Sequence, residues 1–263
     1  MTPVTCRPRS GAYAIVVLAV ALLLGPVSAR AQVIRSYEGL DQAAGADYYA
    51  TITFLVDGAV GNSDFIDTNF AGAFGYKGTS HWIRLYPAYQ LKRSSGENVV
   101  HDRSVHLRHS YIFSDRTRTF AFVQVQFSEA LKLERRSLVG GGIRRQLITL
   151  GADGGVDLGV GVMLDAERIT GEDSRDVGRG ANLLTIYGKA GTVTLSSTTY
   201  FQPAISDWAD HRILVQASAI IPLAGQDVLN LNVSSYWRRD SRPPAGVEKH
   251  DAGFTLGFTV NIG

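Results

Sequence analysis

Strict alternation of apolar and polar residues is the feature that most constrains what this chain can fold into. The last segment, 252–262, places apolar side chains at every even position and small or polar ones at every odd position. A period of two residues is that of a β-strand, because successive side chains point to opposite faces. The same pattern recurs at 51–60, 156–164 and 229–238, and no amphipathic helical pattern of useful length follows Gln32. We therefore predict an all-β fold.

Turn-forming residues separate the alternating runs and indicate how many strands there are. They lie at Gly61-Asn62-Ser63, Lys77-Gly78, Ser94-Ser95-Gly96, Ala152-Asp153-Gly154-Gly155, Gly171-Glu172-Asp173 and Arg242-Pro243-Pro244. Between such turns we predict about twelve strands. Their expected ranges are 48–61, 64–76, 80–92, 98–113, 117–129, 134–149, 155–168, 180–190, 192–202, 210–222, 226–239 and 249–262. An even number brings both ends of a barrel to the same side of a membrane.

The length of these runs favours a transmembrane barrel over a soluble sandwich. Sandwich strands are usually about five or six residues long, whereas about 9–11 residues cross a bilayer at a tilt. Aromatic residues near the ends of the apolar faces suit the girdles at a lipid–water boundary. They are Tyr76, Tyr89, Tyr111, Tyr187 and Trp237. We predict a closed antiparallel up-and-down transmembrane β-barrel, and the alternative is a soluble periplasmic β-sandwich that binds a ligand.

The first residues indicate export from the cytoplasm. Arg7 and Arg9 precede an uncharged apolar run at 12–24, and small residues follow at Ala29 and Ala31. This three-part pattern is that of a secretory signal peptide. The apolar run is shorter than the roughly 20 residues that a membrane-spanning helix needs. We therefore predict a cleaved signal and a location in the outer membrane of a Gram-negative cell.

Cleavage is predicted between Ala31 and Gln32, so that residues 1–31 form the signal peptide and 32–263 a single barrel domain. Cys6, the only cysteine, precedes the apolar run, so the mature chain is expected to have neither a disulfide nor a cysteine metal site. Cleavage removes three of the 26 basic residues and none of the 24 acidic ones, which changes the formal charge from +2 to −1. This balance predicts no nucleic-acid partner.

Several stretches carry a family resemblance in addition to the alternation. Residues 120–168 contain LERRSLVGGGIRRQLI and GVDLGVGVMLDAER, and later come YFQP at 200–203, DWADHR at 207–212 and YWRRDSRPPAGVEKHD at 236–251. From about Tyr49 to Ile262 the chain resembles the salt-induced outer-membrane protein family, which is defined by a domain of unknown function numbered 481. The resemblance implies a monomeric outer-membrane barrel with no established activity, and it supplies no catalytic residues.

The expected location also implies partners. They are outer-membrane lipid, lipopolysaccharide and the barrel-assembly machinery. Many outer-membrane barrels end in an aromatic residue that this machinery recognises, whereas this chain ends Val260-Asn261-Ile262-Gly263. The alternating Phe254, Leu256 and Phe258 could serve as the assembly signal instead.

Charged residues that recur along consecutive predicted hairpins are the candidate functional residues. The arginines of this set are Arg103, Arg108, Arg116, Arg118, Arg135, Arg136, Arg144 and Arg145. They could form an anion-attracting wall or grip lipopolysaccharide phosphates. The simpler interpretation is a lumen network paired with Glu129, Glu134, Asp165 and Glu167, because an unpaired buried charge is costly. The lumen charge network that we predict comprises Arg84, Arg108, Arg144, Asp165 and Glu167.

Three further groups of residues have a functional and a structural interpretation. Gly140-Gly141-Gly142 could form a backbone nest for phosphate, but no helix follows, which favours a strand that bends or bulges. Asp207, Asp210 and His211 could activate water in a membrane-embedded hydrolase, although aspartates are common in turns. Asp165 and Glu167 could likewise be a general acid and base or simply part of a polar interior.

The function expected from the sequence is that of a non-enzymatic barrel, either an envelope structural protein or a narrow pore. Barrels of about eight strands fill with side chains and those of about sixteen leave a channel, so about twelve predicts a narrow or plugged lumen. The alternative is a hydrolase acting on lipid or peptide. No catalytic, cofactor-binding or metal-ligating residue is assigned.

Overall fold

The computed structural model describes residues 47–59, 65–94, 97–223 and 226–262, and nearly all of its regular structure is β-strand. The predicted signal peptide and the cleavage site between Ala31 and Gln32 lie outside these residues. No helix within the described ranges is long and apolar enough to cross a membrane. The predicted all-β class is confirmed.

Thirteen strand segments form one sheet in the described part of the chain. They are β1 (Tyr48–Ala59), β2 (Phe65–Lys77), β3 (His81–Ser94), β4 (Glu97–Ser114), β5 (Thr117–Ser128), β6 (Leu133–Thr149), β7 (Gly155–Ile169), β8 (Arg175–Gly180), β9 (Asn182–Ala190), β10 (Val193–Pro203), β11 (His211–Leu223), β12 (Gln226–Asp240) and β13 (His250–Ile262). Most of them run past ten residues, which is the length that a tilted transmembrane strand requires.

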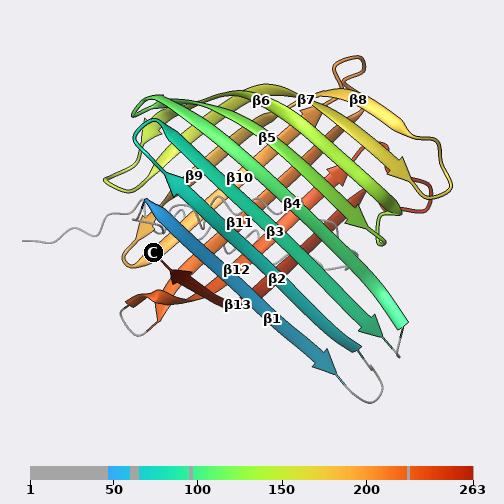
Figure 1. The fold of residues 1–263 in the computed structure, drawn as a ribbon, viewed down its shortest axis with the longest axis horizontal. Coiled ribbons are helices and arrows are strands. Elements are labelled where there is room, and N and C mark those ends of the chain that lie inside the picture. Colours follow the sequence, from blue (N-terminus) through green and yellow to red (C-terminus); the bar gives the residue numbers. More distant parts are fainter. Residues whose placement is uncertain (1–46, 60–64, 95–96, 224–225, 263) are drawn as a thin grey trace, which may run out of the picture.

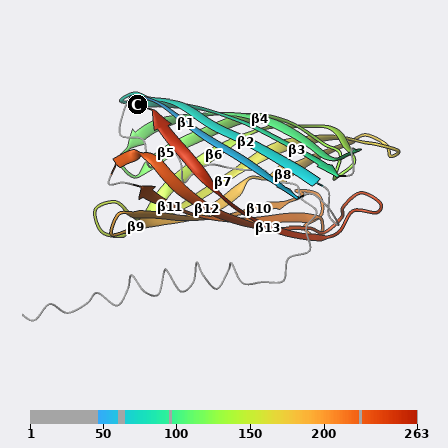
Figure 2. The same ribbon diagram turned by 90° about the horizontal axis from the view of Figure 1, so that it is seen from below.

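The sheet closes on itself, as Figure 1 shows. Antiparallel pairing joins neighbouring strands around the ring, and β1 pairs with β13, with Ala50 opposite Ile262. Viewed from below, β1–β4 lie in one wall and β9–β12 in the facing wall, and β13 crosses from the second wall to the first, where it ends beside β1 (Figure 2). The alternative of a two-sheet sandwich is therefore wrong, because a single closed sheet leaves no pair of open edges.

The eighth strand position differs from the prediction. It was expected at 180–190, but pairing with β7 already begins at Arg175 and continues through two segments, β8 and β9. The break falls at Ala181, whose N–H donates to the Gly161 carbonyl. Counting β8 and β9 as one interrupted strand, the described residues form the predicted twelve-stranded barrel. The sequence concealed the start of this strand because Gly178 and Gly180 resemble turn residues.

The outward face of the barrel is an apolar belt. Large aliphatic side chains expose about half of their surface on consecutive strands, for example Val105 on β4, Val139 on β6 and Val162 on β7. Four of the predicted girdle aromatics, Tyr76, Tyr89, Tyr111 and Trp237, are exposed there as well. Tyr187 is a correction: its hydroxyl accepts a hydrogen bond from Gln146 Nε2 inside the barrel. Such a surface suits contact with lipid.

The two ends of the barrel differ in the lengths of their connections. At one end, which we call the turn end, connections such as 115–116 and 191–192 are short, and both barrel termini lie there. At the other, the loop end, the connections include 204–210 and 241–249. In outer-membrane barrels the short turns face the periplasm and the longer loops face outward.

Candidate functional site in the barrel interior

The inward faces of the strands are polar and buried. Along β7 the inward residues Asp157, Met163 and Asp165 are 1%, 4% and 1% exposed, whereas the outward Val160 and Val162 are 54% and 60% exposed. This alternation is the one seen in the sequence, and it places the apolar side chains outward, toward lipid. Charged groups inside the barrel therefore depend on one another for compensation.

Asp165 is the centre of a cluster of ion pairs near the loop end. Its Oδ1 accepts from Arg136 Nε at 2.8 Å and its Oδ2 accepts from Arg136 Nη2 at 2.9 Å. The same Oδ2 accepts from Arg179 Nε at 3.1 Å and from Arg212 Nη1. One carboxylate on β7 thus binds guanidinium groups from β6, β8 and β11.

Further carboxylates complete this cluster. Arg212 reaches Glu167 Oε1 at 2.8 Å and Asp240 Oδ2 at 2.7 Å. Asp210 accepts from Arg179 Nη1 at 3.0 Å and pairs with Arg175. We call these eight residues the loop-end network: Arg136, Arg175, Arg179, Arg212, Asp165, Glu167, Asp210 and Asp240. Four guanidinium groups balance four carboxylates, so the network is neutral as a unit.

A second charged cluster lies near the turn end. Asp157 Oδ2 accepts from Arg144 Nε and from Arg118 Nη2, both at 2.9 Å. Close by, the Arg84 guanidinium stacks on the Trp82 ring at 3.9 Å and donates to Ser110 Oγ at 2.6 Å. Stacking and hydrogen bonding of this kind suit a planar guanidinium in a buried place.

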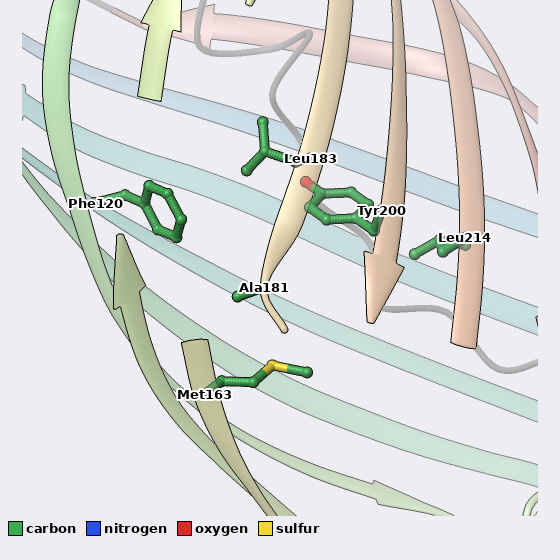
Figure 3. Packing of buried hydrophobic residues seen from close by; sticks show 6 residues of the cluster. All are labelled: Phe120, Met163, Ala181, Leu183, Tyr200 and Leu214. Carbon is green, nitrogen blue, oxygen red and sulfur yellow. The ribbon is translucent and has the colours of Figure 1, made fainter. Parts of the chain in front are cut away.

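An apolar layer separates the two charged clusters. It consists of Phe120, Met163, Ala181, Leu183, Tyr200 and Leu214, whose side chains gather inside the barrel (Figure 3). All six are less than 9% exposed. Side chains therefore pack against one another at mid-height, in the manner of a protein core.

The glycine triplet lies in the wall beside this layer. Gly142 is directly opposite Gly161 in the β6–β7 register, and no register shift occurs at the triplet. A Cβ on Gly142 would come within 2.1 Å of the Val160 carbonyl oxygen and 2.8 Å of the Phe120 ring. The triplet is thus part of a continuous strand, neither a phosphate nest nor a bulge, and it leaves room for the inward aromatic ring.

The remaining wall carries neutral hydrogen bonds between hydroxyl groups, together with an ion pair of Arg238 and the buried Asp251 at 3.7 Å near the loop end. Hydroxyl pairs join neighbouring strands: Thr53 to Thr259 at 2.9 Å, Thr185 to Thr198 at 3.1 Å, and Ser196 to Ser218 at 2.8 Å. These pairs lie on β1, β9, β10, β11 and β13, and we call them the hydroxyl ladder. Hydroxyls can donate and accept, so each pair compensates itself without a charge.

The five residues proposed from the sequence for a lumen network all lie inside the barrel but belong to different groups. Asp165 and Glu167 are in the loop-end network, whereas Arg144 pairs with Asp157 near the turn end. Arg84 lies in the turn-end cluster, and Arg108 is buried, 5% exposed. Within this set, the structure links Asp165 and Glu167 through two shared partners, Arg136 and Arg212.

The arginine set of the sequence divides in the same way. Arg118, Arg136 and Arg144 point inward to carboxylates. Arg103, Arg135 and Arg145 are exposed on the outward face. Of the acids proposed as lumen partners, Glu129 is exposed and lies 3.8 Å from His101, and Glu134 is also exposed.

Asp207, Asp210 and His211 do not form a catalytic pair in the structure. Asp207 binds Arg242 at 2.6 Å, and Asp210 belongs to the loop-end network. The His211 ring lies 3.2 Å from the Trp208 carbonyl oxygen, and within the described part of the chain it forms no hydrogen bond or ion pair with either aspartate. The pKa of Asp207 is lowered by the Ala209 N–H, which donates to it, and then by Arg242. Among the described residues no group of three or more side chains could hold a metal ion.

Sequence reasoning missed several members of the charged clusters. Arg179 fell before the predicted start of its strand, so its inward direction was not foreseen. Arg212 lies near the start of the predicted strand 210–222 and Asp240 one residue beyond the predicted strand 226–239, where the alternation of faces is hardest to assign. Asp157 stood on the polar face of a predicted strand, and that signal could have placed it inside beside Arg144.

The mouth at the loop end is covered by the connection 241–249, which we call the mouth loop. The Ala245 carbonyl oxygen accepts from Lys132 Nζ at 2.7 Å, and the Ala245 N–H donates to Glu172 at 2.8 Å. Val247 packs against the cluster of Leu131, Leu133 and Ile169. The loop leaves β12 and bonds to connections beside β6 and β7 on the facing wall. Under it lies a cavity of about 30 Å³, roughly the volume of one water molecule.

Closure, length and the apolar belt together define a membrane-spanning β-barrel with a filled interior. Residues 52–262 match the family model described as "Protein of unknown function, DUF481". The chain belongs to this family.

Several solved structures are similar to the chain. The translocator domain of the autotransporter NalP from Neisseria meningitidis is 11% identical, with 97% of each chain covered and a TM-score of 0.45. The β domain of the Bordetella autotransporter BrkA is 11% identical, with 82% of this chain and 98% of that one covered and a TM-score of 0.38. A bacterial polysaccharide outer-membrane secretin is 8% identical, with 82% and 96% covered and a TM-score of 0.41. No curated protein sequence matches the chain.

Proposed function

We propose that this chain is a closed β-barrel of the bacterial outer membrane with a structural role in the envelope. In this proposal it is exported through a cleaved signal peptide, inserted by the barrel-assembly machinery and works as a monomer among lipid and lipopolysaccharide. The observation that carries the proposal is the filled interior, where Arg179 is fully buried and Asp165 is 1% exposed.

Ion flow needs a continuous water-filled path through the barrel. Three groups of interior side chains fill the space that such a path would need. The loop-end network links β6, β7, β8, β11 and β12 across the lumen by ion pairs of 2.7–3.3 Å together with shorter contacts. The apolar layer lies below it, and the pairs of the hydroxyl ladder, buried at Thr53 and Thr185 and half-buried at Ser196, line the facing wall. Guanidinium groups of the loop-end network that are already paired with carboxylates also offer little charge to a permeating anion.

The mouth loop supports the same function. Its contacts with Lys132, Glu172 and the Leu133 cluster hold it against the wall opposite to its own strands. A loop bonded in this way covers the loop-end network from outside. No comparable arrangement favours the hydrolase, because Asp207 and Asp210 are both held by arginines.

Single-channel conductance tests this proposal. The chain starting at Gln32 would be refolded and inserted into planar bilayers, with its heat-dependent mobility in detergent gels as the control for folding. We expect a mobility shift with no discrete conductance steps. Discrete steps from the wild-type chain would overturn the closed barrel in favour of a narrow pore, and the absence of both steps and mobility shift would overturn the membrane barrel itself.

A matched variant sharpens the test. Arg212→Ala removes the residue that links Asp165, Glu167 and Asp240, whereas Ser218→Ala alters the hydroxyl ladder on the same strand. If the network closes the lumen, only the Arg212 variant should show occasional steps. Equal silence with a retained mobility shift would mean that the apolar layer alone closes the barrel.

A further inference from the structure

We propose that the outward face at the loop end binds the phosphate group of a lipid headgroup. The site consists of Arg103 on β4, Arg135 on β6 and Arg168 on β7, which we call the arginine row. This inference rests on the proposed membrane location and adds a ligand class on the lipid-facing side, away from the interior.

All three arginines are exposed and stand on the same side of the wall as the apolar belt. On β4, Arg103 follows the outward alternation of Leu107 and Val105 toward the loop end. On β7, Arg168 has the same relation to the outward Leu164, which is 49% exposed. Because side chains alternate along a strand, each arginine lies just beyond the belt on its own face. That is the level of lipid headgroups.

The register brings two of these cations together. Arg135 is directly opposite Arg168 in the β6–β7 pairing. Like charges that face each other across antiparallel strands are destabilising. A phosphate placed between them would reverse the sign of this interaction and satisfy both guanidinium groups.

The third arginine is held toward the same place by an aromatic ring. The Arg103 guanidinium lies 4.4 Å from the centre of the Phe127 ring. Phe127 is on β5, the strand between Arg103 and β6, with Arg103 as its partner in the β4–β5 register. Stacking orients the planar group and leaves its N–H edge available for an acceptor.

Carboxylates near the arginine row do not neutralise it. Glu134 is exposed at the start of β6, and Asp176 is exposed opposite Ala166 on β8. Within the described residues neither forms an ion pair with an arginine of the row. Glu129 lies beside His101 instead. This contrasts with the interior, where each guanidinium of the loop-end network has a carboxylate partner.

A lipid fits this surface better than free phosphate. Guanidinium groups bind phosphate oxygens in pairs of parallel hydrogen bonds. Directly below the row, Val105, Val125 and Val139 form part of the apolar belt, which suits acyl chains. A headgroup phosphate attached to acyl chains can contact both surfaces at once, whereas an inorganic phosphate can use only the charges.

Lipid retention by the refolded chain tests the site. The experiment compares the wild type with the double variant Arg135→Gln/Arg168→Gln. The control is Arg145→Gln, which alters an exposed arginine at the turn end. Each protein would first be checked for a heat-dependent mobility shift. Native mass spectrometry would then measure binding of diphosphorylated lipid A, dephosphorylated lipid A and inorganic phosphate. We expect about tenfold weaker binding of phosphorylated lipid A by the double variant and no change in the control, as for the loss of charge-assisted contacts.

Other outcomes would contradict the proposal in different ways. Equal binding of phosphorylated and dephosphorylated lipid A by the wild type would mean that only the apolar belt holds the lipid. Displacement of lipid A by inorganic phosphate at similar concentrations would assign the row to free phosphate. Equal loss in the Arg145 control would indicate a general charge effect. A chain without the mobility shift would instead refute the membrane barrel of the proposed function.

Discussion

The loop-end network and the hydroxyl ladder are both buried in the same lumen, yet they compensate their polar groups by different means. In the network, the Asp165 carboxylate binds three guanidinium groups. In the ladder, hydroxyls pair one to one, as Thr53 does with Thr259. A buried charge needs partners from several strands and so fixes the positions of those strands relative to one another. A hydroxyl pair fixes only two neighbouring strands. The network therefore links strands across the lumen, and the ladder secures one wall.

This difference leads to unequal consequences of mutation. Removing one member of a buried ion cluster leaves its partners charged and unpaired. Removing both members of a hydroxyl pair leaves nothing uncompensated.

The largest effect is expected at Asp165. The variant Asp165→Asn removes the charge shared by Arg136, Arg179 and Arg212 and should lower the free energy of unfolding by about 3–5 kcal/mol. Urea unfolding in detergent micelles measures this change. A loss comparable to that of a hydroxyl variant would show that the network adds no more stability than the ladder.

The next effect concerns how tightly each wall is packed. A Cβ on Gly142, in the β6–β7 wall beside the apolar layer, would meet the Val160 carbonyl oxygen at 2.1 Å, whereas one on Gly188, on β9 of the ladder wall, has only Gly154 Cα at 3.7 Å. We expect Gly142→Ala to cost about 1–3 kcal/mol through overpacking, and Gly188→Ala to be close to neutral. Urea unfolding midpoints of both variants, measured in the same micelles, test this difference. Equal midpoints would show that the β6–β7 wall can open to accept a methyl group.

A smaller effect is expected in the ladder itself. Ser196 and Ser218 are 2.8 Å apart, and the double variant Ser196→Ala/Ser218→Ala removes both partners. Its free energy of unfolding should change by less than about 1 kcal/mol, and the single variant Ser196→Ala should be at least as destabilised. A double variant as damaged as Asp165→Asn would contradict the contrast between the two regions.

The smallest effect is expected for the exposed pair of Asp207 and Arg242 on the loops. The Ala209 N–H and Arg242 hold the pKa of Asp207 below its ordinary value of 3.8. A lowered pKa in the folded chain adds stability that is present in full above 3.8 and is lost as the pH falls through the folded value. The unfolding midpoints of wild type and Asp207→Asn should therefore differ by a small constant amount from pH 7 to pH 5 and converge only at lower pH. A difference that vanishes already at pH 5 would show that the carboxylate is not stabilised by these donors.

Much of the architecture could be predicted because it depends on a local pattern. The alternation at 252–262 became β13, and similar runs became β7 and β12 with the expected faces outward. The start of the eighth strand was wrong because Gly178 and Gly180 resemble a turn, and only pairing with β7 reveals them as strand. Tyr187 was assigned to the lipid face, although its hydroxyl is bonded inside the barrel.

The sequence by itself determined the strand period, the approximate number of strands and which face of each strand is apolar. These properties follow from residues two positions apart in the chain. Only the tertiary structure decided which inward charges meet. Asp165 and Arg212 are 47 positions apart in the chain and come together because the sheet closes with a particular stagger between strands. The register of the β6–β7 hairpin separates Arg144 from Asp165 and places Arg135 opposite Arg168 on the outer face. Partner choice in a barrel is a property of the register, which the face pattern and the turns set between neighbouring strands and which the stagger of the closed sheet carries around the ring.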